Sequence, residues 1–527
     1  QLSTVIDAKQ ITNLLLVLRD PYQLVLLSPG AIKSTNNDGG FSVNGQRDRN
    51  NNFLLDGSDN NDTSVPGIPG GLVNANPDSA QEFRVITNNF DAEFGRNTGA
   101  IVDVVTRGGT NTFHGGAYEF GRYNALGARD YFNSKANGPQ DPYVRNDFGA
   151  SVGGPILKDR LFFFLNGEVQ RFRTTRTDNQ VVPNAAFKTG VFTYNSPDGS
   201  STPVNLNNPA GNPNNLSGLG IDPTMAKLLA ITPVGQQDLG DGVSTLLFFP
   251  SPDALNDYTL TGRLDYAINP KQQLTVRYTY GHSAESNPFH SEVLPGIGSY
   301  NNIATAHNGS ISLASTLTSS ITNLARASYN QSNSGFFCQG FQAIDAITGL
   351  DSFGHGRDIT LPYFGEPQTS TPGPLTYGCG QLGDSNGQAR LSSTLLFGDT
   401  MTVVKGAHSI KFGGEFRDVK DTNYDDFFSR EGLSLTNFTD FSVPSYVYNG
   451  PADSPNLLPF EDLVWGPTGA IANSLQNQFF TRSGARQAND LTRFVQREWA
   501  IFGQDTWKIT PRFTAILGLR YEFNGVP

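Results

Sequence analysis

The fold is decided by residues 75–123, ANPDSAQEFRVITNNFDAEFGRNTGAIVDVVTRGGTNTFHGGAYEFGRY, where two kinds of sequence meet. Up to Thr106 the residues favour a small mixed α/β unit, because Pro77 suits the first turn of a short helix and two β-rich runs follow it. From Phe113 onward the chain has the alternating pattern of β-strands almost throughout. We therefore predict an N-terminal α/β domain over residues 1–111 and a β domain over residues 112–527.

Apolar and polar residues alternate most clearly in residues 258–268 (YTLTGRLDYAI) and 272–283 (QQLTVRYTYGHS), with a turn at residues 269–271 (NPK) between them. Both runs place aromatic and aliphatic side chains on one face and charged or hydroxyl side chains on the other. A soluble sandwich would bury the apolar face in a core. A membrane barrel would turn that face to lipid and turn the charges to a wet interior.

The connections between the predicted strands alternate in length. We expect about eleven strands from the period-two pattern, near residues 113–123, 147–154, 161–172, 257–268, 272–283, 307–316, 321–331, 389–402, 408–420, 497–508 and 512–523. Short turns alternate with long loops, which we expect at about residues 124–146, 173–256, 284–306, 332–388 and 421–496. Short periplasmic turns and long extracellular loops are typical of an outer-membrane barrel, whereas a soluble sandwich has no reason to segregate them.

The composition excludes several classes of protein. Charged residues make up 16% of the 527 residues, and 57 are glycines, which suits an antiparallel β protein with long loops better than a helical one. The net charge of −11 argues against nucleic-acid binding, which needs a basic surface. No apolar run reaches the roughly 18 residues of a transmembrane helix, although barrel strands need only about 9–11 alternating residues.

Three further features concern processing and loop structure. The chain begins at Gln1 without a methionine or a signal peptide, so we expect either a mature form or a fragment. Cys338 and Cys379 fall in one long irregular region and are disulfide candidates, as in oxidising compartments. Two free thiols are the alternative. The long loops, rich in Asn, Pro, Gly and Ser, are either poorly ordered surface segments or substrate-capturing ones, and their length alone does not distinguish the two.

The stretch at the domain boundary resembles the end of the plug domain of TonB-dependent outer-membrane receptors. The resemblance rests on Phe83–Thr87, Phe94-Gly95, Gly99-Ala100, Ile101–Val105 and Thr106-Arg107. Two further blocks, FSVNGQRDRNNNFLLDG at residues 41–57 and RNDFGASVGGPILKDRLFFF at residues 145–164, are similar to the Oar-like branch of that family. The three blocks together make the resemblance specific, and it extends over the whole chain.

The resemblance implies a plug inside a large antiparallel transmembrane barrel in the outer membrane of Gram-negative bacteria. It further implies 22 strands in the whole barrel. The period-two pattern predicts about eleven of them in this chain. It implies extracellular binding of a bulky nutrient and energised import through a periplasmic TonB partner. The family's TonB-contacting segment precedes the plug, and nothing matching it is seen before Gln1.

The sequence contains no recognisable catalytic or cofactor-binding constellation. The six histidines are scattered without metal-ligand spacing, and no Gly-x-Ser-x-Gly elbow or phosphate-binding loop is present. Asp56, Asp59 and Asp62 are a weak candidate for Ca²⁺, because carboxylate oxygens at that density suit the ion. A hydrogen-bonded turn inside the plug is the more ordinary interpretation, since the Glu that completes an EF-hand loop is missing.

Charged residues of the first domain are candidates for ion pairs with the polar faces of the barrel strands. A plug in a polar lumen must be held without a hydrophobic core and must still be released. Charge pairs across a wet interface allow both, although each charge could instead be simply hydrated. The candidates are Arg84, Arg96, Arg107, Glu93 and Asp103 in the first domain and Arg263, Asp265, Arg277, Glu415 and Arg417 in the second.

Three functional classes follow from these patterns. We favour a transporter that imports a bulky nutrient, with the plug gating the barrel lumen. A surface adhesin or structural barrel, whose loops bind a partner without transport, is the alternative. An enzyme is disfavoured by the missing catalytic residues. Siderophore, oligosaccharide and peptide substrates all fit.

Overall fold

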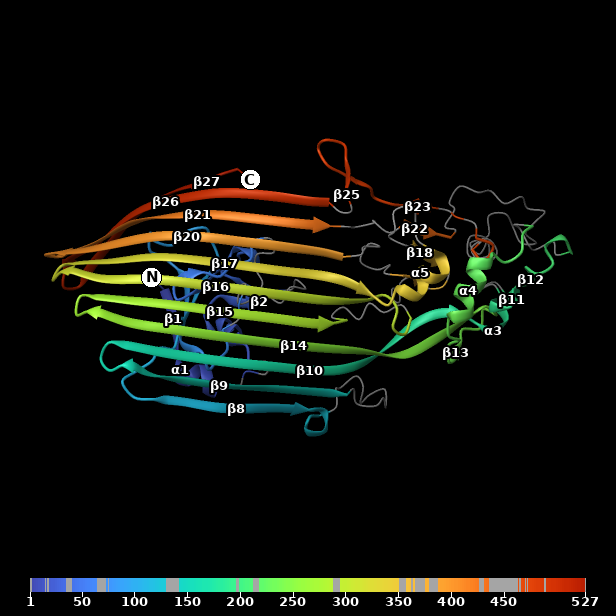
Figure 1. The fold of residues 1–527 in the computed structure, drawn as a ribbon, viewed down its shortest axis with the longest axis horizontal. Helices are drawn as coiled ribbons and strands as arrows, with labels where there is room; N and C mark the ends of the chain where they lie inside the picture. Colours follow the sequence, from blue (N-terminus) through green and yellow to red (C-terminus); the bar gives the residue numbers. More distant parts are fainter. Residues whose placement is uncertain are drawn as a thin grey trace.

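The computed structural model describes residues 2–14, 16, 19–34, 40–63, 73, 75–128, 142–195, 199–211, 218–287, 294–349, 357–361, 364, 375–378, 387–425, 431–435, 463, 466–469, 471, 473–487 and 490–526. The described chain is mainly β and forms two bodies, a small N-terminal unit and a long antiparallel sheet (Figure 1). No helix among the described residues is long and apolar enough to cross a membrane.

The N-terminal unit is built on a five-stranded sheet with the order β1-β6-β7-β4-β5. Aromatic residues in its core meet edge to face: the ring centroids of Tyr22 lie 5.7 Å from Phe53 and 5.4 Å from Phe83. A capping box at Asp7 begins the first helix. The elements are β1 (Leu2–Asp7), α1 (Ala8–Asn13), η1 (Pro21–Leu27), β2 (Ala31–Lys33), β3 (Phe41–Val43), η2 (Asp48–Asn50), β4 (Asn52–Leu55), β5 (Ser58–Asp59), β6 (Ala80–Asn88) and β7 (Ile101–Thr106).

One local expectation for this unit was wrong. Pro77 lies in a turn that leads into β6, and no helix begins there. The reason is that the side chain of Asn76 accepts hydrogen bonds from the backbone N–H groups of Asp78 and Ser79, at 3.1 and 2.9 Å. This Asx-type turn satisfies the backbone without a helix. The change from the small sheet to the large one falls between Thr106 and His114.

The long sheet contains the strands that the alternation predicted. Along its path the described residues form eleven strands in unbroken antiparallel order from β8 to β27, and β13 (Gln237–Asp238) adds to β14 off this path. Its two edges are β8 and β27. The strands are β8 (His114–Tyr123), β9 (Tyr143–Leu157), β10 (Leu161–Pro183), β14 (Ser244–Asn269), β15 (Gln272–Ser286), β16 (Ser299–Thr318), β17 (Ile321–Gln339), β20 (Gly387–Lys405), β21 (His408–Asp425), β26 (Asp490–Thr510) and β27 (Phe513–Asn524).

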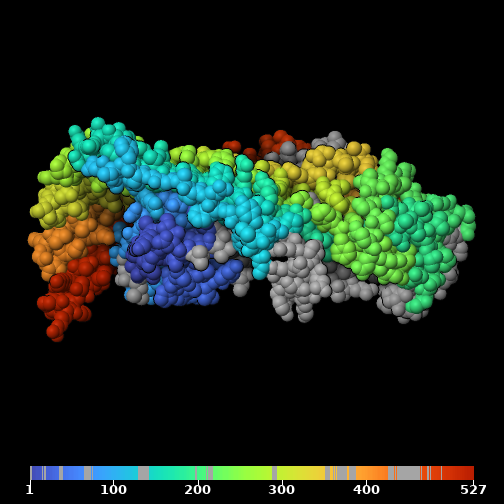
Figure 2. All heavy atoms as spheres, turned by 90° about the horizontal axis from the view of Figure 1, so that it is seen from below, coloured from blue at the N-terminus to red at the C-terminus, as the bar shows by residue number. Residues whose placement is uncertain are grey.

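The N-terminal unit lies in the hollow of the curved sheet. Figure 2 shows residues of the N-terminal unit, in dark blue, beneath an arch that runs from the cyan strands to the red ones. The convex face carries apolar residues such as Leu260, Leu264, Tyr278 and Ile501. Each of these residues is between 43% and 56% exposed. The alternation therefore sorts apolar residues outward and polar residues toward the N-terminal unit.

Several strands extend well beyond the predicted ends, and this corrects the expected loop boundaries. β10 continues to Pro183 and β14 begins at Ser244, so much of the range 173–256 is strand, and their ladder is unbroken from Leu161 to Pro183. These extensions lack a clear period-two alternation of apolar and polar residues, for example RTTRTDNQVVP at residues 173–183, so the pattern does not mark where the strands end. Short elements complete the connections: η3 (Asn124–Leu126), α3 (Ala185–Lys188), β11 (Val191–Asn195), β12 (Ser201–Asn205), η4 (Pro209–Gly211), α4 (Pro223–Ile231), α5 (Gln342–Thr348), β18 (Arg357–Leu361), β19 (Leu375–Tyr377), β22 (Glu431–Ser434), β23 (Asn473–Leu475), β24 (Phe479–Phe480) and β25 (Arg486–Gln487).

The long connections share one hydrophobic core at the far end of the sheet (Figure 1). Phe187, Leu228, Ile344, Phe364 and Tyr377 are all at most 1% exposed, although they come from two different connections, β10–β14 and β17–β20. We call the segments that contribute to this core the loop module; it includes α3, β11, β12, α4, α5, β18, β19 and β22 together with the outer ends of β10 and β14. In their described parts the loops are packed structures rather than poorly ordered segments.

Candidate functional site

The site that joins the two bodies is built around the tight turn between β4 and β5. Leu55 pairs with Ser58, so Asp56 and Gly57 are the two central residues. Both have positive φ angles, 52° and 69°. An Asp-Gly pair with two positive φ angles is the signature of a type I′ hairpin turn. The local sequence therefore makes a narrow projection with a carboxylate at its tip.

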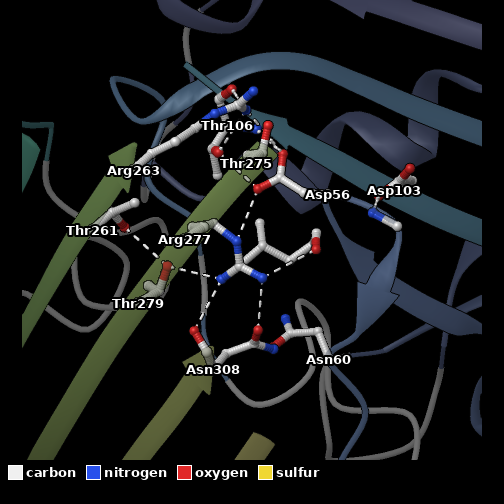
Figure 3. Close-up of polar contacts among 12 residues, drawn as sticks. Asp56, Asn60, Asp103, Thr106, Thr261, Arg263, Thr275, Arg277, Thr279 and Asn308 are labelled. Atoms are coloured by element: carbon white, nitrogen blue, oxygen red, sulfur yellow. Dashed lines mark hydrogen bonds and ion pairs between the residues drawn. The ribbon is translucent and has the colours of Figure 1, made fainter. Parts of the chain in front are cut away.

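The carboxylate of Asp56 meets two arginines of the sheet (Figure 3). Arg277 of β15 approaches one oxygen with its Nε at 2.9 Å, and Arg263 of β14 approaches the other with its Nη1 at 3.4 Å. Thr106 donates to the same carboxylate from its backbone nitrogen at 2.8 Å and its hydroxyl at 2.7 Å. Asp56 thus links the end of β7 to two strands of the large sheet.

The guanidinium of Arg277 is completely buried, with 0% of its side chain exposed. Besides Asp56, its Nη2 donates to the side-chain oxygen of Asn308 at 2.7 Å and to the carbonyl oxygen of Leu55 at 3.2 Å. Its Nη1 donates to the carbonyl oxygen of Asn308 at 3.1 Å. A buried charge is tolerable because several acceptors replace its hydration.

The rest of the turn is held by two more arginines. Arg326 of β17 donates from Nη1 to the carbonyl oxygen of Gly57 at 3.0 Å. Arg417 of β21 forms an ion pair with Asp59. Asn330 donates to the Asp59 carbonyl oxygen at 2.9 Å. We call the four side chains from four strands, Arg263, Arg277, Arg326 and Arg417, the arginine clamp.

Further polar contacts surround the clamp on the side of β21, β26 and β27. Arg96 of the N-terminal unit meets Glu498 of β26 at 3.0 Å. Lys411 of β21 meets Glu93 at 2.7 Å. Arg520 of β27 donates to the Glu93 carbonyl oxygen at 2.9 Å. These contacts extend the charged interface along the sheet.

On the side of β9 and β10 the contacts are again polar. Arg19 bridges Asp78 in its own unit, at 2.6 Å, and Glu168 of β10, at 3.2 Å. The side-chain amide of Asn76 donates to that of Asn166 at 2.6 Å, with both residues buried. Ion pairs and amide hydrogen bonds therefore hold the N-terminal unit to both flanks of the concave face.

The ion-pair candidates from the sequence divide into two groups. Arg96, Glu93, Arg263, Arg277 and Arg417 contact the opposite body, as described above. The others have contacts inside their own body: Arg107 donates to the Ala80 carbonyl oxygen at 3.0 Å, Arg84 is the register partner of Asp103, Asp265 meets Arg263 at 2.9 Å, and Glu415 meets Arg417 at 3.6 Å.

Asp103 lies directly behind the Asp-Gly turn. Its carboxylate accepts a hydrogen bond from the backbone nitrogen of Gly57 at 3.0 Å. Burial raises the pKa of Asp103 to about 6, because desolvation disfavours the carboxylate and outweighs that hydrogen bond. Asp103 therefore joins the buried interior of the N-terminal unit to the turn that enters the arginine clamp.

The calcium candidate is not supported by the side-chain arrangement. Asp56 and Asp59 direct their carboxylates to arginines of the sheet, so these groups neutralise cationic side chains. Among the residues that the structure describes, Asp62 included, no group of three or more His, Cys, Asp or Glu side chains could hold a metal ion. Asp56 lies in the turn between β4 and β5, and Asp59 lies in β5.

The disulfide candidate falls partly within the described chain. Cys338, near the end of β17, is disulfide-bonded and 6% exposed. Cys379 lies outside the described residues. The specific pairing of the two therefore stays a prediction.

Sequence reasoning missed several residues of the interface. Arg326, Asn308, Asn330, Lys411 and Glu498 all contact the N-terminal unit. Each stands on the polar face of a strand, and that was the available signal. It is a weak signal because every strand has many positions on its polar face. Which of them contact the N-terminal unit depends on where that unit lies in the folded protein.

Comparisons with known proteins agree with this architecture. Residues 105–527 match the family model described as an outer membrane beta barrel domain. The "TonB-dependent transporter Oar" of Myxococcus xanthus is 37% identical over 165 residues, which make up 30% of this chain and 15% of that protein.

Solved structures share the fold at low sequence identity. The outer membrane transporter YddB from Escherichia coli matches with a TM-score of 0.57 and 10% identity, over 99% of this chain and 56% of that one. The siderophore receptor PirA from Acinetobacter baumannii matches with a TM-score of 0.53 and 13% identity, over 99% and 56%. The chain thus spans about half the length of these two proteins.

These findings confirm the predicted fold class and the resemblance on which it rested. The relatives are described as transporters and receptors rather than as enzymes. Its matched domain places it in the outer membrane. The chain belongs to the outer membrane beta-barrel domain family, and within it resembles the TonB-dependent receptors of the Oar type.

Proposed function

We propose that residues 1–111 are a plug that gates the lumen of the barrel formed by residues 112–527, and that the protein imports a bulky nutrient with the help of periplasmic TonB. The observation that carries the proposal is the arginine clamp on the Asp56–Asp59 turn. An interface made of ion pairs and amides holds the plug in register, yet exposes little apolar surface if the plug moves.

The strength of the clamp suits a gate that opens only under work. Breaking one buried ion pair typically costs about 3–5 kcal/mol. The clamp contains Arg277 and Arg417 as buried members, so spontaneous release of the turn is rare. An energised partner supplies the work in the proposed mechanism, and water can hydrate the separated charges afterwards.

Energy-dependent movement is the feature that tests this proposal. Ser58, in β5 at the clamp, is 3% exposed, so a Ser58→Cys thiol should be protected from a membrane-impermeant maleimide in resting cells. Labelling should rise in energised cells that carry the full protein and fall when an uncoupler is added. Thr112→Cys, at an exposed position between the two bodies, should be labelled equally under both conditions and serves as the matched control.

A second experiment addresses gating itself. Deleting residues 1–111 from the full protein should raise its KCl conductance in planar bilayers, because the plug fills the hollow of the sheet (Figure 2). Unchanged conductance would exclude a gating role for the plug.

A surface adhesin is the second candidate, and the loop module favours it. The described loops share a core of 22 buried residues, so they can present a defined binding surface without any transport. In an adhesin the plug has no reason to move. Ser58→Cys labelling that ignores the uncoupler, together with retained surface binding, would support this function over import.

A further inference from the structure

The convex face of the sheet carries a compact group of basic side chains on β21 and β26. The orientation follows from strand alternation: Arg417 and Glu498 contact the N-terminal unit, so the residues next to them in sequence point the other way. Lys420 on β21 and Arg493 and Arg497 on β26 therefore face outward. We call these three residues the outer basic cluster.

The outer basic cluster lies at one end of an apolar band. Along β26 the outward positions after Arg497 are occupied by Trp499, Ile501 and Gly503, and the next outward charge is Asp505. Trp499 and Ile501 are 42% and 56% exposed. Eight residues of strand at about 3.4 Å each, tilted by roughly 40°, correspond to about 20 Å along the membrane normal, close to the apolar height of such barrels.

The depth of the cluster follows from this band. Its other end, at Asp505 and His408, lies beside the short connection between β26 and β27, and those two side chains meet at 2.7 Å. The outer basic cluster lies on the side of the long connections and the loop module. By the rule that short turns are periplasmic, it stands at headgroup depth in the outer leaflet.

The geometry of the cluster leaves its charge available. The strand register sets Thr422 opposite Arg493, Lys420 opposite Val495 and Asp418 opposite Arg497. Asp418 approaches Lys420 at 3.1 Å and Arg497 at 3.5 Å. Even so, 60% of the Lys420 side chain and 75% of the Arg497 side chain are exposed. Three cations and one carboxylate leave a net charge of +2 on this patch.

We propose that Lys420, Arg493 and Arg497 form a binding site for the phosphate-bearing headgroup of an outer-leaflet lipid. Arginine matches phosphate geometry with paired donors, and lysine adds a point charge. The apolar band immediately below, with Trp499 at its edge, accepts the acyl chains of the same molecule. Long basic side chains that merely extend into water would need no such clustering beside a lipid-facing tryptophan.

Tryptophan quenching by brominated lipids can measure this site directly. In the full protein, Trp465→Phe and Trp507→Phe leave Trp499 as the reporter within this chain, and any other tryptophan is replaced likewise. The protein is placed in dioleoylphosphatidylcholine nanodiscs with added phosphatidic acid or phosphatidylcholine, each brominated on its acyl chains. Phosphatidic acid should quench Trp499 preferentially. A variant that keeps Trp507 instead, near the opposite end of the band, should respond equally to both lipids.

Removing a positive charge and removing the negative charge should change the preference for phosphatidic acid in opposite directions. Each of Lys420→Gln, Arg493→Gln and Arg497→Gln should weaken the preference for phosphatidic acid about five-fold, the effect of one basic residue near a charged membrane surface. Asp418→Asn should strengthen it by a similar factor, because it removes the opposing charge. Lys405→Gln, at the opposite end of the neighbouring strand β20, should change nothing.

Several results would overturn the proposal. Equal quenching of Trp499 by both lipids would exclude a phosphate preference. A weaker preference in Asp418→Asn would mean that Asp418 holds the cluster in place and that electrostatic attraction to the lipid is not the cause. Complete competition by inorganic phosphate at the concentration of the lipid would assign the site to free phosphate. These outcomes are independent of import, since no transport is measured.

Discussion

Arg277→Met is the sharpest test of the arginine clamp, because Arg277 is fully buried and has four acceptor contacts to Asp56, Asn308 and Leu55. Removing one partner of a buried pair typically costs about 3–5 kcal/mol. Asp56 keeps its contacts with Arg263 and Thr106, so the lower figure applies. A loss of about 3 kcal/mol makes the released turn roughly 150-fold more populated.

The assay follows maleimide labelling of Ser58→Cys in the full protein, whose rate is proportional to the released population when closing is fast. Arg277→Met should raise the rate about 150-fold, as derived from the buried-pair cost. Arg263→Met should raise it by only about five-fold, since Arg263 is 17% exposed and lies 3.4 Å from Asp56. Adding Asp56→Asn to Arg277→Met should recover part of the loss, because no carboxylate then stays partly unpaired.

A particular order of the labelling rates among the variants would refute the reasoning. If Arg277→Met accelerated labelling no more than Arg263→Met, burial would not decide the strength of the clamp. If Thr112→Cys showed the same acceleration, the whole interface would have loosened and the effect could not be assigned to the turn. The exposed position therefore has to keep its rate in every variant.

The remaining predictions concern the plug interior, the turn and the loop module. Burial raises the pKa of Asp103 to about 6, above its unfolded value of 3.8, so the folded plug gains stability as pH falls from 6 to 4 and loses it as pH rises through 6. Asp103→Asn should flatten this dependence, measured as the urea midpoint of the plug, whereas an unchanged pH profile would contradict the assignment. Gly57→Ala adds a Cβ only 2.6 Å from the guanidinium of Arg326, at a backbone φ of +69°. Gly45→Ala is its control, because φ is similar, +76°, and the added Cβ would have no atom within 4 Å. Both should lose about 1 kcal/mol of plug stability, but only Gly57→Ala should speed Ser58→Cys labelling, and equal labelling would argue against a close fit. Leu228→Ala should destabilise the loop module by about 2–5 kcal/mol in thermal unfolding without changing that labelling, because its core is separate. Non-reducing digestion should yield a peptide linking Cys338 to Cys379, and two alkylatable thiols would disprove it.

Local sequence determined the strands and their two faces. In residues 258–268 the period of two alone placed Leu260 and Leu264 on one face and Arg263 on the other, because successive side chains of a strand point to opposite faces. The Asp56-Gly57 pair likewise fixed a tight turn, since few residue pairs accept two positive φ angles. Such features depend on neighbours in the chain, and sequence analysis can therefore find them.

Tertiary structure alone decided which charges meet. Asp59 and Arg417 are 358 positions apart, and nothing near either residue specifies the other. Every inward strand position was a candidate partner, so Asp56 and Asp59 could be taken for calcium ligands. The common core of the loop module was hidden for the same reason. Its residues come from separate connections, and the sheet brings them together only after the strands have paired.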